Sequence, residues 1–158
     1  MIKNRRFKEQ DAKEVSDLVR RTLRETNIKD YPEEYIEKDI AKIDENFFIE
    51  RSKWTSCYVF TDEKTERIIC VGSIGAYWGS ETESSLFTIF VSPDYQGKGI
   101  GKKIMEKLES DEYYLRAKRI EIPASITALS FYQKLGYDFK DGVDQVDEEG
   151  LYRLEKFR

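Results

Sequence analysis

Histidine is absent from the sequence, and its absence excludes several kinds of active site. A Ser–His or Cys–His pair, a histidine-ligated zinc ion and an imidazole general base all require that side chain. Any proton transfer in this protein must therefore use a carboxylate, a tyrosine, a lysine, a thiol or water.

Cysteine and long apolar runs are also scarce. Cys57 and Cys70 are too few for a disulfide framework or a zinc site. They fall in neighbouring predicted strands, so they could form a redox pair or be two buried thiols. Disulfides are rare in cytosolic proteins, which favours two buried thiols. The least polar stretch, residues 68–78, is too short for a membrane span of ~20 residues. No signal-peptide pattern follows Met1, so we expect a cytoplasmic protein.

The charge balance is slightly acidic, with 27 Lys and Arg residues against 31 Asp and Glu residues. A nucleic-acid-binding domain usually carries a basic patch, so this balance disfavours that class of protein. The length of 158 residues predicts a single domain over residues 1–158. Its mixture of 39% hydrophobic and 37% charged residues is typical of a folded chain rather than a disordered one.

The order of predicted elements indicates a mixed α/β or α+β fold with antiparallel hairpins around one strand–helix–strand unit. Alternating and β-branched patterns predict strands at residues 2–8, 54–61, 67–78, 85–91, 119–122, 137–140 and 150–157. Apolar residues at three- and four-residue spacings predict helices at residues 10–23, 32–43, 100–108 and 126–135. The polar segments between these elements include an acidic turn at residues 141–149.

The most informative segment is residues 91–102, where a predicted strand runs through a glycine-rich loop directly into a helix. Gly97, Gly99 and Gly101 stand at alternate positions. Lys98 lies between the first two glycines, and Lys102 follows the third. The first amides of a helix have no intrahelical partner and lie at the positive end of its dipole. Glycine lets such a backbone approach a phosphate closely. The segment therefore predicts a pyrophosphate-binding loop, although its spacing matches neither a Walker A nor a Rossmann loop.

Two motifs resemble those of the GNAT superfamily of N-acyltransferases. Residues 96–101 read Q-x-x-G-x-G, which is similar to the acyl-CoA pyrophosphate loop of that family. Residues 125–137 read S-x-x-A-x-x-F-Y-x-x-x-G-Y, which resembles the second signature of the family, with Ser125 where the family more often has Asn. The resemblance covers residues 85–140, and the N-terminal half fits only in outline.

The resemblance implies a central mixed, mostly antiparallel twisted sheet with splayed central strands, flanked by helices on both faces. It implies direct transfer of an acetyl group from acetyl-CoA to a primary amine in a ternary complex, without a metal ion. Backbone groups of the splayed strand would pair with the pantetheine arm, the loop amides would hold the phosphates, and Ser125 would touch the arm. The implied acetyl-CoA-binding residues are Phe90, Val91, Gln96, Gly97, Lys98, Gly99, Ile100, Gly101, Lys102, Ser125 and Tyr132.

Tyr132 and Glu83 are the two candidate catalytic residues. Tyr132 matches the F-Y position of the second motif, and its phenol is suited to protonate the departing CoA sulfur. The alternative is a tyrosine that serves packing alone. Glu83 lies just before the predicted strand at 85–91, where many family members place a carboxylate that acts as general base through water. Glu83 also fits an ordinary solvated turn.

The sequence names the acyl donor far better than the acceptor. A small-molecule amine is favoured over a peptide amine, with a weak preference for cationic molecules from the acidic balance. Five aromatic residues are candidates for an acceptor pocket, although a core position is the simpler interpretation of Trp54; they are Tyr31, Tyr35, Trp54, Tyr77 and Trp78. A non-catalytic acyl-CoA sensor and a nucleotide-phosphate-binding domain stay open as alternatives. Dimers are common in the family, so a homodimer is also open.

Overall fold

A single seven-stranded sheet runs through the computed structural model, which describes all 158 residues. Its strand order is β1-β2-β3-β4-β5-β7-β6, and every neighbouring pair is antiparallel except β4 and β5. The strands are β1 (Ile2–Arg6), β2 (Thr55–Asp62), β3 (Arg67–Ala76), β4 (Glu83–Val91), β5 (Arg119–Ala124), β6 (Asp138–Phe139) and β7 (Tyr152–Phe157). The prediction of a mixed, mostly antiparallel sheet is confirmed.

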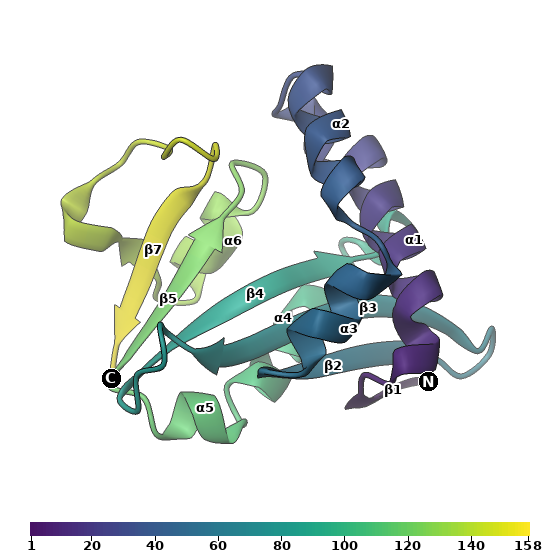
Figure 1. The fold of residues 1–158 in the computed structure, drawn as a ribbon, viewed down its shortest axis with the longest axis horizontal. Coiled ribbons are helices and arrows are strands. Elements are labelled where there is room, and N and C mark those ends of the chain that lie inside the picture. Colours follow the sequence, from purple (N-terminus) through teal and green to yellow (C-terminus); the bar gives the residue numbers. More distant parts are fainter.

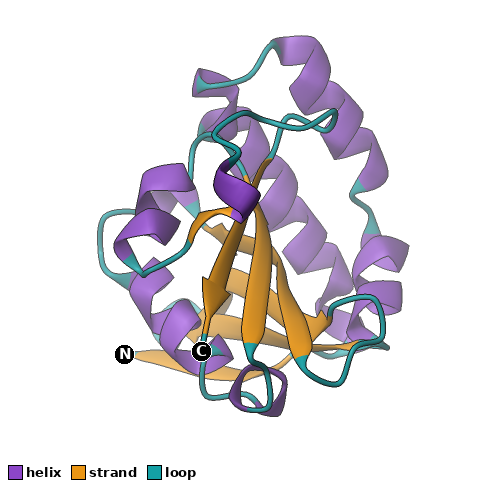
Figure 2. Ribbon diagram, turned by 90° about the vertical axis from the view of Figure 1, so that its left-hand side faces the viewer, coloured by secondary structure: helices purple, strands orange, loops and turns teal.

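Helices cover both faces of the sheet, as predicted (Figure 2). They are α1 (Ala12–Glu25), α2 (Glu33–Lys42), α3 (Glu45–Ser52), α4 (Ile100–Leu108), α5 (Glu112–Leu115) and α6 (Leu129–Lys134). The first three pack on one face, around a buried cluster that includes Val15, Phe48 and Val71. The last three pack on the other face, around a cluster that includes Leu86 and Ile104. None of the helices is long and apolar enough to cross a membrane.

The two central strands separate along their length. Only three positions of β4 pair with β5, from Glu83 opposite Arg119 to Ser85 opposite Glu121. Beyond that point β4 continues to Val91 while β5 turns away toward β7, so the strands form a V (Figure 1). The splayed central strands that the family resemblance implies are therefore present, with Ser85 and Glu121 at the vertex.

A β-bulge changes the direction of side chains halfway along β4. Phe87 pairs with Ser73 and Phe90 pairs with Val71, so β4 has one residue more than β3 over this stretch. The extra residue coincides with Thr88, which has a φ of 47° and whose hydroxyl lies 3.3 Å from that of Ser73. Because a bulge reverses the alternation of a strand, Leu86 and Ile89 can contact the same core. No sequence pattern predicted it.

The two cysteines are buried, unpaired thiols, as the sequence favoured. In the hairpin of β2 and β3, Cys57 lies opposite Ser73 and Cys70 lies opposite Phe60. The two residues belong to core clusters on opposite faces of the sheet, so their side chains point away from each other. Burial raises the pKa of the Cys57 thiol to about 11, which keeps it protonated at neutral pH.

Two helices were not predicted, and one is shorter than expected. Helix α3 begins after Asp44, whose carboxylate accepts a hydrogen bond from the amide of Phe47 at 2.8 Å. Its apolar residues are consecutive rather than periodic, which hides the helix from a spacing analysis. Helix α5 is a single turn at Glu112–Leu115. Helix α6 occupies six residues within the predicted 126–135 because a turn at residues 125–128 precedes it.

Candidate active site

The loop between β4 and α4 presents a run of unpaired backbone amides. From residue 96 to residue 102, no backbone N–H donates a hydrogen bond within the protein, and the first helical bond runs from Lys103 to Gly99. Lys98, Lys102 and Lys103 lie in or beside this run, and none of them pairs with a carboxylate. Consecutive free amides at the N-terminus of a helix bind anions. This geometry suits a pyrophosphate.

The three glycines of the loop serve two different purposes. Gly97 and Gly99 have φ angles of 75° and 79°, a left-handed conformation that other residues adopt only at a cost, and a Cβ added to either would have no atom within 4 Å. Gly101 is helical, and a Cβ there would lie 3.1 Å from the ring of Phe131. The first two glycines shape the loop, whereas Gly101 allows α4 to pack closely against α6.

Side chains fasten the loop to the end of α1 and to β4. Arg21 donates two hydrogen bonds to the carboxylate of Asp94, at 2.7 and 2.8 Å. Gln96 donates from Nε2 to the carbonyl of Val91 at 3.2 Å and to the hydroxyl of Thr26 at 3.1 Å. These contacts fix the position of the amide run relative to the V.

Of the two strand residues predicted to pair with pantetheine, Val91 presents its backbone to the open side of β4. Phe90 lies opposite Val71, and Ser92 donates to the carbonyl of Ile69 on β3 at 2.8 Å. In an antiparallel ladder the backbone groups of successive residues point alternately to the two sides. The groups of Phe90 are therefore directed to β3 and those of Val91 to the cleft, where its carbonyl accepts the Gln96 bond.

Tyr132 lies on α6 and is 4% exposed. Burial raises the pKa of its phenol, which stays protonated at neutral pH, and its hydroxyl makes no hydrogen bond within the protein. Gly136 follows the end of the helix with a φ of 96°, and the amide of Tyr137 donates to the carbonyl of Tyr132, which suits the glycine of the second motif. At the start of the same segment, Ser125 accepts a hydrogen bond from the amide of Ala128 at 3.1 Å.

Glu83 is held in an ion-pair network at the closed end of the V. Its carboxylate accepts a hydrogen bond from Arg119 at 2.8 Å. Arg119 also donates to Glu121 and, at 2.7 Å, to Glu155, so one guanidinium joins β4, β5 and β7. Lys140 adds a second cation, 3.0 Å from Glu121. Sequence reasoning missed this network, although acidic and basic residues alternate with isoleucine in residues 119–122.

A cavity of about 510 Å³ opens beside the vertex of the V. Four aromatic side chains line it, together with Ser85, Glu121 and Pro123 from the two splayed strands and Lys140 and Arg153 at the edge. The aromatic residues are Trp54, Tyr77, Trp78 and Phe87. Trp54 is 48% exposed, so the interpretation of this residue as core was wrong. The cavity lies on the face of the sheet that α1, α2 and α3 cover over β1 to β4. It is open because these helices do not extend over β5 and β7.

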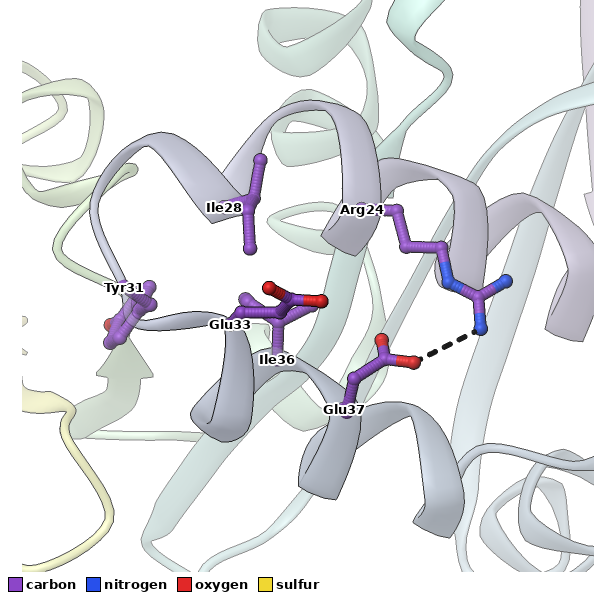
Figure 3. Close-up of a pocket in the computed structure, with 6 residues that line it drawn as sticks. All are labelled: Arg24, Ile28, Tyr31, Glu33, Ile36 and Glu37. Atoms are coloured by element: carbon purple, nitrogen blue, oxygen red, sulfur yellow. Dashed lines mark hydrogen bonds and ion pairs between the residues drawn. The ribbon is translucent and has the colours of Figure 1, made fainter.

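Tyr31 and Tyr35 do not belong to this cavity. Tyr31 lines a separate pocket of about 430 Å³ between the end of α1 and α2, which Arg24 and Glu37 bridge at 3.4 Å (Figure 3). Its hydroxyl donates to the carbonyl of Gly150 at 2.7 Å and accepts from the amide of Ile126 at 2.8 Å. No residue of β4 or β5 lines this second pocket.

Comparison with known proteins agrees with this geometry. The family model of the acetyltransferase (GNAT) domain matches residues 53–138, more than half of the chain. The chain belongs to the GNAT acetyltransferase family. Its amide run, V-shaped strands and second motif all fall within or at the edge of the matched residues.

The relatives of this chain differ in the share of their length that the chain covers. It is 29% identical over 89 residues to GCN5-related N-acetyltransferase 2, chloroplastic, of Arabidopsis thaliana, covering 56% of this chain but only 32% of that protein. The PaiA N-acetyltransferase of Thermoplasma acidophilum, solved in complex with coenzyme A, superposes with a TM-score of 0.82 at 20% identity, over 100% of this chain and 99% of that one. A GCN5-related N-acetyltransferase of Rhodopseudomonas palustris superposes at 0.80 with 22% identity, over 99% and 95%. At such identities the superpositions establish the GNAT fold.

Proposed function

We propose that this protein transfers an acetyl group from acetyl-CoA to the primary amine of a small molecule, with both substrates bound at once. The run of free amides at residues 96–102 carries the proposal, because it offers a site for the CoA pyrophosphate at the open edge of β4. The cavity beside the vertex offers the acceptor a site of its own, because none of residues 96–102 lines it. A molecule that only sensed acyl-CoA would have no need of that cavity.

In the proposed reaction the neutral amine nitrogen forms a bond to the acetyl carbon and the bond between that carbon and sulfur breaks. The nitrogen loses one proton and the sulfur gains one, so an amide and free CoA are the products. Tyr132 is suited to donate to the sulfur because its phenol is protonated at neutral pH and its hydroxyl makes no hydrogen bond within the protein, although the raised pKa favours a hydrogen bond to the departing thiolate over complete proton transfer. Bulk solvent or Glu83, acting through water, accepts the proton from the amine.

Donor binding is tested with Gly99→Glu and a matched control, Gly142→Glu. Both glycines have positive φ, 79° and 71°, and a Cβ added at either position would have no atom within 4 Å, but Gly142 lies outside the loop. We expect calorimetric titration with acetyl-CoA to show at least tenfold weaker binding for Gly99→Glu and unchanged binding for Gly142→Glu. Unchanged affinity in a folded Gly99→Glu protein would contradict the assignment.

The role of Tyr132 is tested with Tyr132→Phe, which removes only the hydroxyl. We expect kcat to fall about 100-fold, the usual scale for loss of an acid catalyst, with little change in KM. Tyr137→Phe is the control, since that neighbouring ring lies 6.3 Å from Tyr132 and is also buried. Normal turnover by folded Tyr132→Phe enzyme would refute the role.

The role of Glu83 as general base is tested with Glu83→Gln. If Glu83 is the base, the pH–rate profile of this variant should lose its acidic limb.

The amine class is tested by following thiol release over a panel of small amines and peptides. We expect acetylation of small amines and no acetylation of peptides, because the cavity of about 510 Å³ has the size of a small-molecule site. Binding of acetyl-CoA without thiol release on any amine would instead support the sensor function. Thermal stabilisation by ATP but not by CoA would support the nucleotide-binding alternative.

A further inference from the structure

Trp78 occupies a position that costs the folded protein free energy. Its φ is 47° and that of Gly79 is 72°, and the amide of Ser80 donates to the carbonyl of Tyr77 at 2.9 Å. Two central residues with positive φ are the mark of a type I′ turn, which favours Asn-Gly rather than Trp-Gly. The side chain is also 90% exposed, although it is the largest apolar group available. The Tyr77 ring is the one aromatic partner of Trp78 within the chain, and it leaves most of the indole exposed, which points to a ligand that covers it.

Trp78 lines the cavity at the vertex of the V together with three other aromatic residues. Trp78 meets Tyr77 edge to face at 6.3 Å, and Trp54 meets Phe87 in the same way at 5.1 Å. The cavity volume of about 510 Å³ lies within the range of small-molecule sites. Rings on its walls complement a flat apolar body better than a hydrated chain.

The charges around the cavity argue against an acceptor that carries several positive charges. Glu121 is its one carboxylate, and that group is already bonded to Arg119 and Lys140. Arg51 has no carboxylate partner and lies 5.2 Å from the ring of Trp54 and 4.8 Å from that of Phe87. A polycation would therefore meet a fixed positive charge and find no free anion.

We infer that the acceptor is a monoamine carried on an aromatic ring by a short chain, and that Trp78 is the residue that selects it. This inference rests on the proposed acetyl transfer. The ring would lie between Trp78 and the pair Trp54 and Phe87. The amine would then point to Ser85 and Glu121 at the vertex, beside the cleft proposed for the acetyl group. The bonds formed and broken are those of the acetyl transfer described under the proposed function: the amine nitrogen binds the acetyl carbon and the carbon–sulfur bond breaks.

The test compares 2-phenylethylamine, propylamine and spermidine by thiol release from acetyl-CoA. We expect kcat/KM for 2-phenylethylamine to exceed that for each of the others by about tenfold or more, the scale of one or two aromatic contacts. In Trp78→Asn the ratio of 2-phenylethylamine to propylamine should fall about tenfold, mainly through KM. The thermal midpoint should stay equal or rise, because Asn-Gly suits the turn. A purely structural role for Trp78 predicts the opposite stability change.

Two control variants accompany this comparison. Trp78→Phe keeps a ring and should retain most of the selectivity. Phe157→Asn removes another exposed aromatic ring, 69% accessible and outside the cavity, and should change neither the ratio nor KM. A preference for spermidine, or an equal loss on all amines in Trp78→Asn, would overturn the inference while leaving acetyl transfer intact.

Calorimetric titration of 2-phenylethylamine separates the two levels of the proposal. Binding that depends on Trp78, without thiol release from acetyl-CoA on any amine, would support the ligand class and refute the transfer. Absence of binding by the wild-type protein, in the presence of CoA, would refute the ligand class. Thiol release on propylamine in that case would show that the transfer itself stands.

Discussion

The two arms of the sheet are stabilised differently on the face that carries the cavity. Over β1 to β4 this face is covered by α1, α2 and α3, and its side chains form a buried apolar cluster. Over β5 and β7 no helix covers it, and Arg119 instead joins Glu83, Glu121 and Glu155. The second arm therefore has no apolar core on this face, and its side chains form an uncovered surface beside the V. Charged side chains can lie on that surface because each is paired with an opposite charge.

The largest expected effect is in the covered arm, from Phe48→Ala. Phe48 lies on α3, is fully buried and packs with residues of α1 and β2 in the apolar cluster. Removing a buried phenyl ring leaves a cavity, so we expect the free energy of unfolding to fall by about 3 to 5 kcal/mol. Urea denaturation measures it. Phe47→Ala, at a half-buried position next to it, should cost clearly less, and equal costs would contradict the comparison.

A smaller loss is expected in the open arm from Arg119→Met. The change leaves carboxylates without their shared cation, two of them with only 4% and 14% of their side chains exposed. Removing one partner of a buried ion pair usually costs about 3–5 kcal/mol, and we expect about 2 to 3 kcal/mol here because Glu83 is reachable by solvent. The same denaturation experiment measures it.

The matched control neutralises the carboxylates together with the cation. Arg119→Met combined with Glu121→Gln and Glu155→Gln should be more stable than Arg119→Met alone, because the charges then left unpaired, on Glu83 and Lys140, are the ones that solvent reaches. If the combined variant were less stable than the single one, the network would act through hydrogen bonds rather than through charge pairing.

The smallest effect concerns acid stability of the loop before β7. Burial favours the protonated form of Asp147, but the amide of Leu151, the Arg153 guanidinium and the amide of Glu149 outweigh it and hold the pKa of Asp147 below its ordinary value. A lowered pKa stabilises the fold above about pH 4 and loses that contribution as the pH falls through the folded-state pKa. Asp147→Asn should therefore cost less than about 1 kcal/mol at pH 7 and nearly nothing near pH 2. Urea midpoints at both pH values measure this, and a gap that widened in acid would contradict it.

Local signals predicted the strand–loop–helix unit and its neighbours well. The buried face of α4 contains Ile100, Ile104, Met105 and Leu108, as their spacing predicted. Gly136 has the left-handed conformation expected at a helix end. These features depend on residues a few positions apart, whose preferences survive in any context. Helix α3 was missed because its signal is a single capping residue, Asp44, rather than a periodic pattern.

The sequence by itself determined the family, the amide run at residues 96–102 and the presence of two buried thiols, because each depends on local spacing or composition. Only the tertiary structure decided which side chains meet. It placed Glu83 on Arg119, brought Trp54 and Trp78 into one cavity while leaving Tyr31 in another, and turned Cys57 and Cys70 to opposite faces. These outcomes depend on strand register and on which part of the sheet the helices leave open. Register and coverage arise from contacts between residues far apart in the chain, which no local pattern encodes.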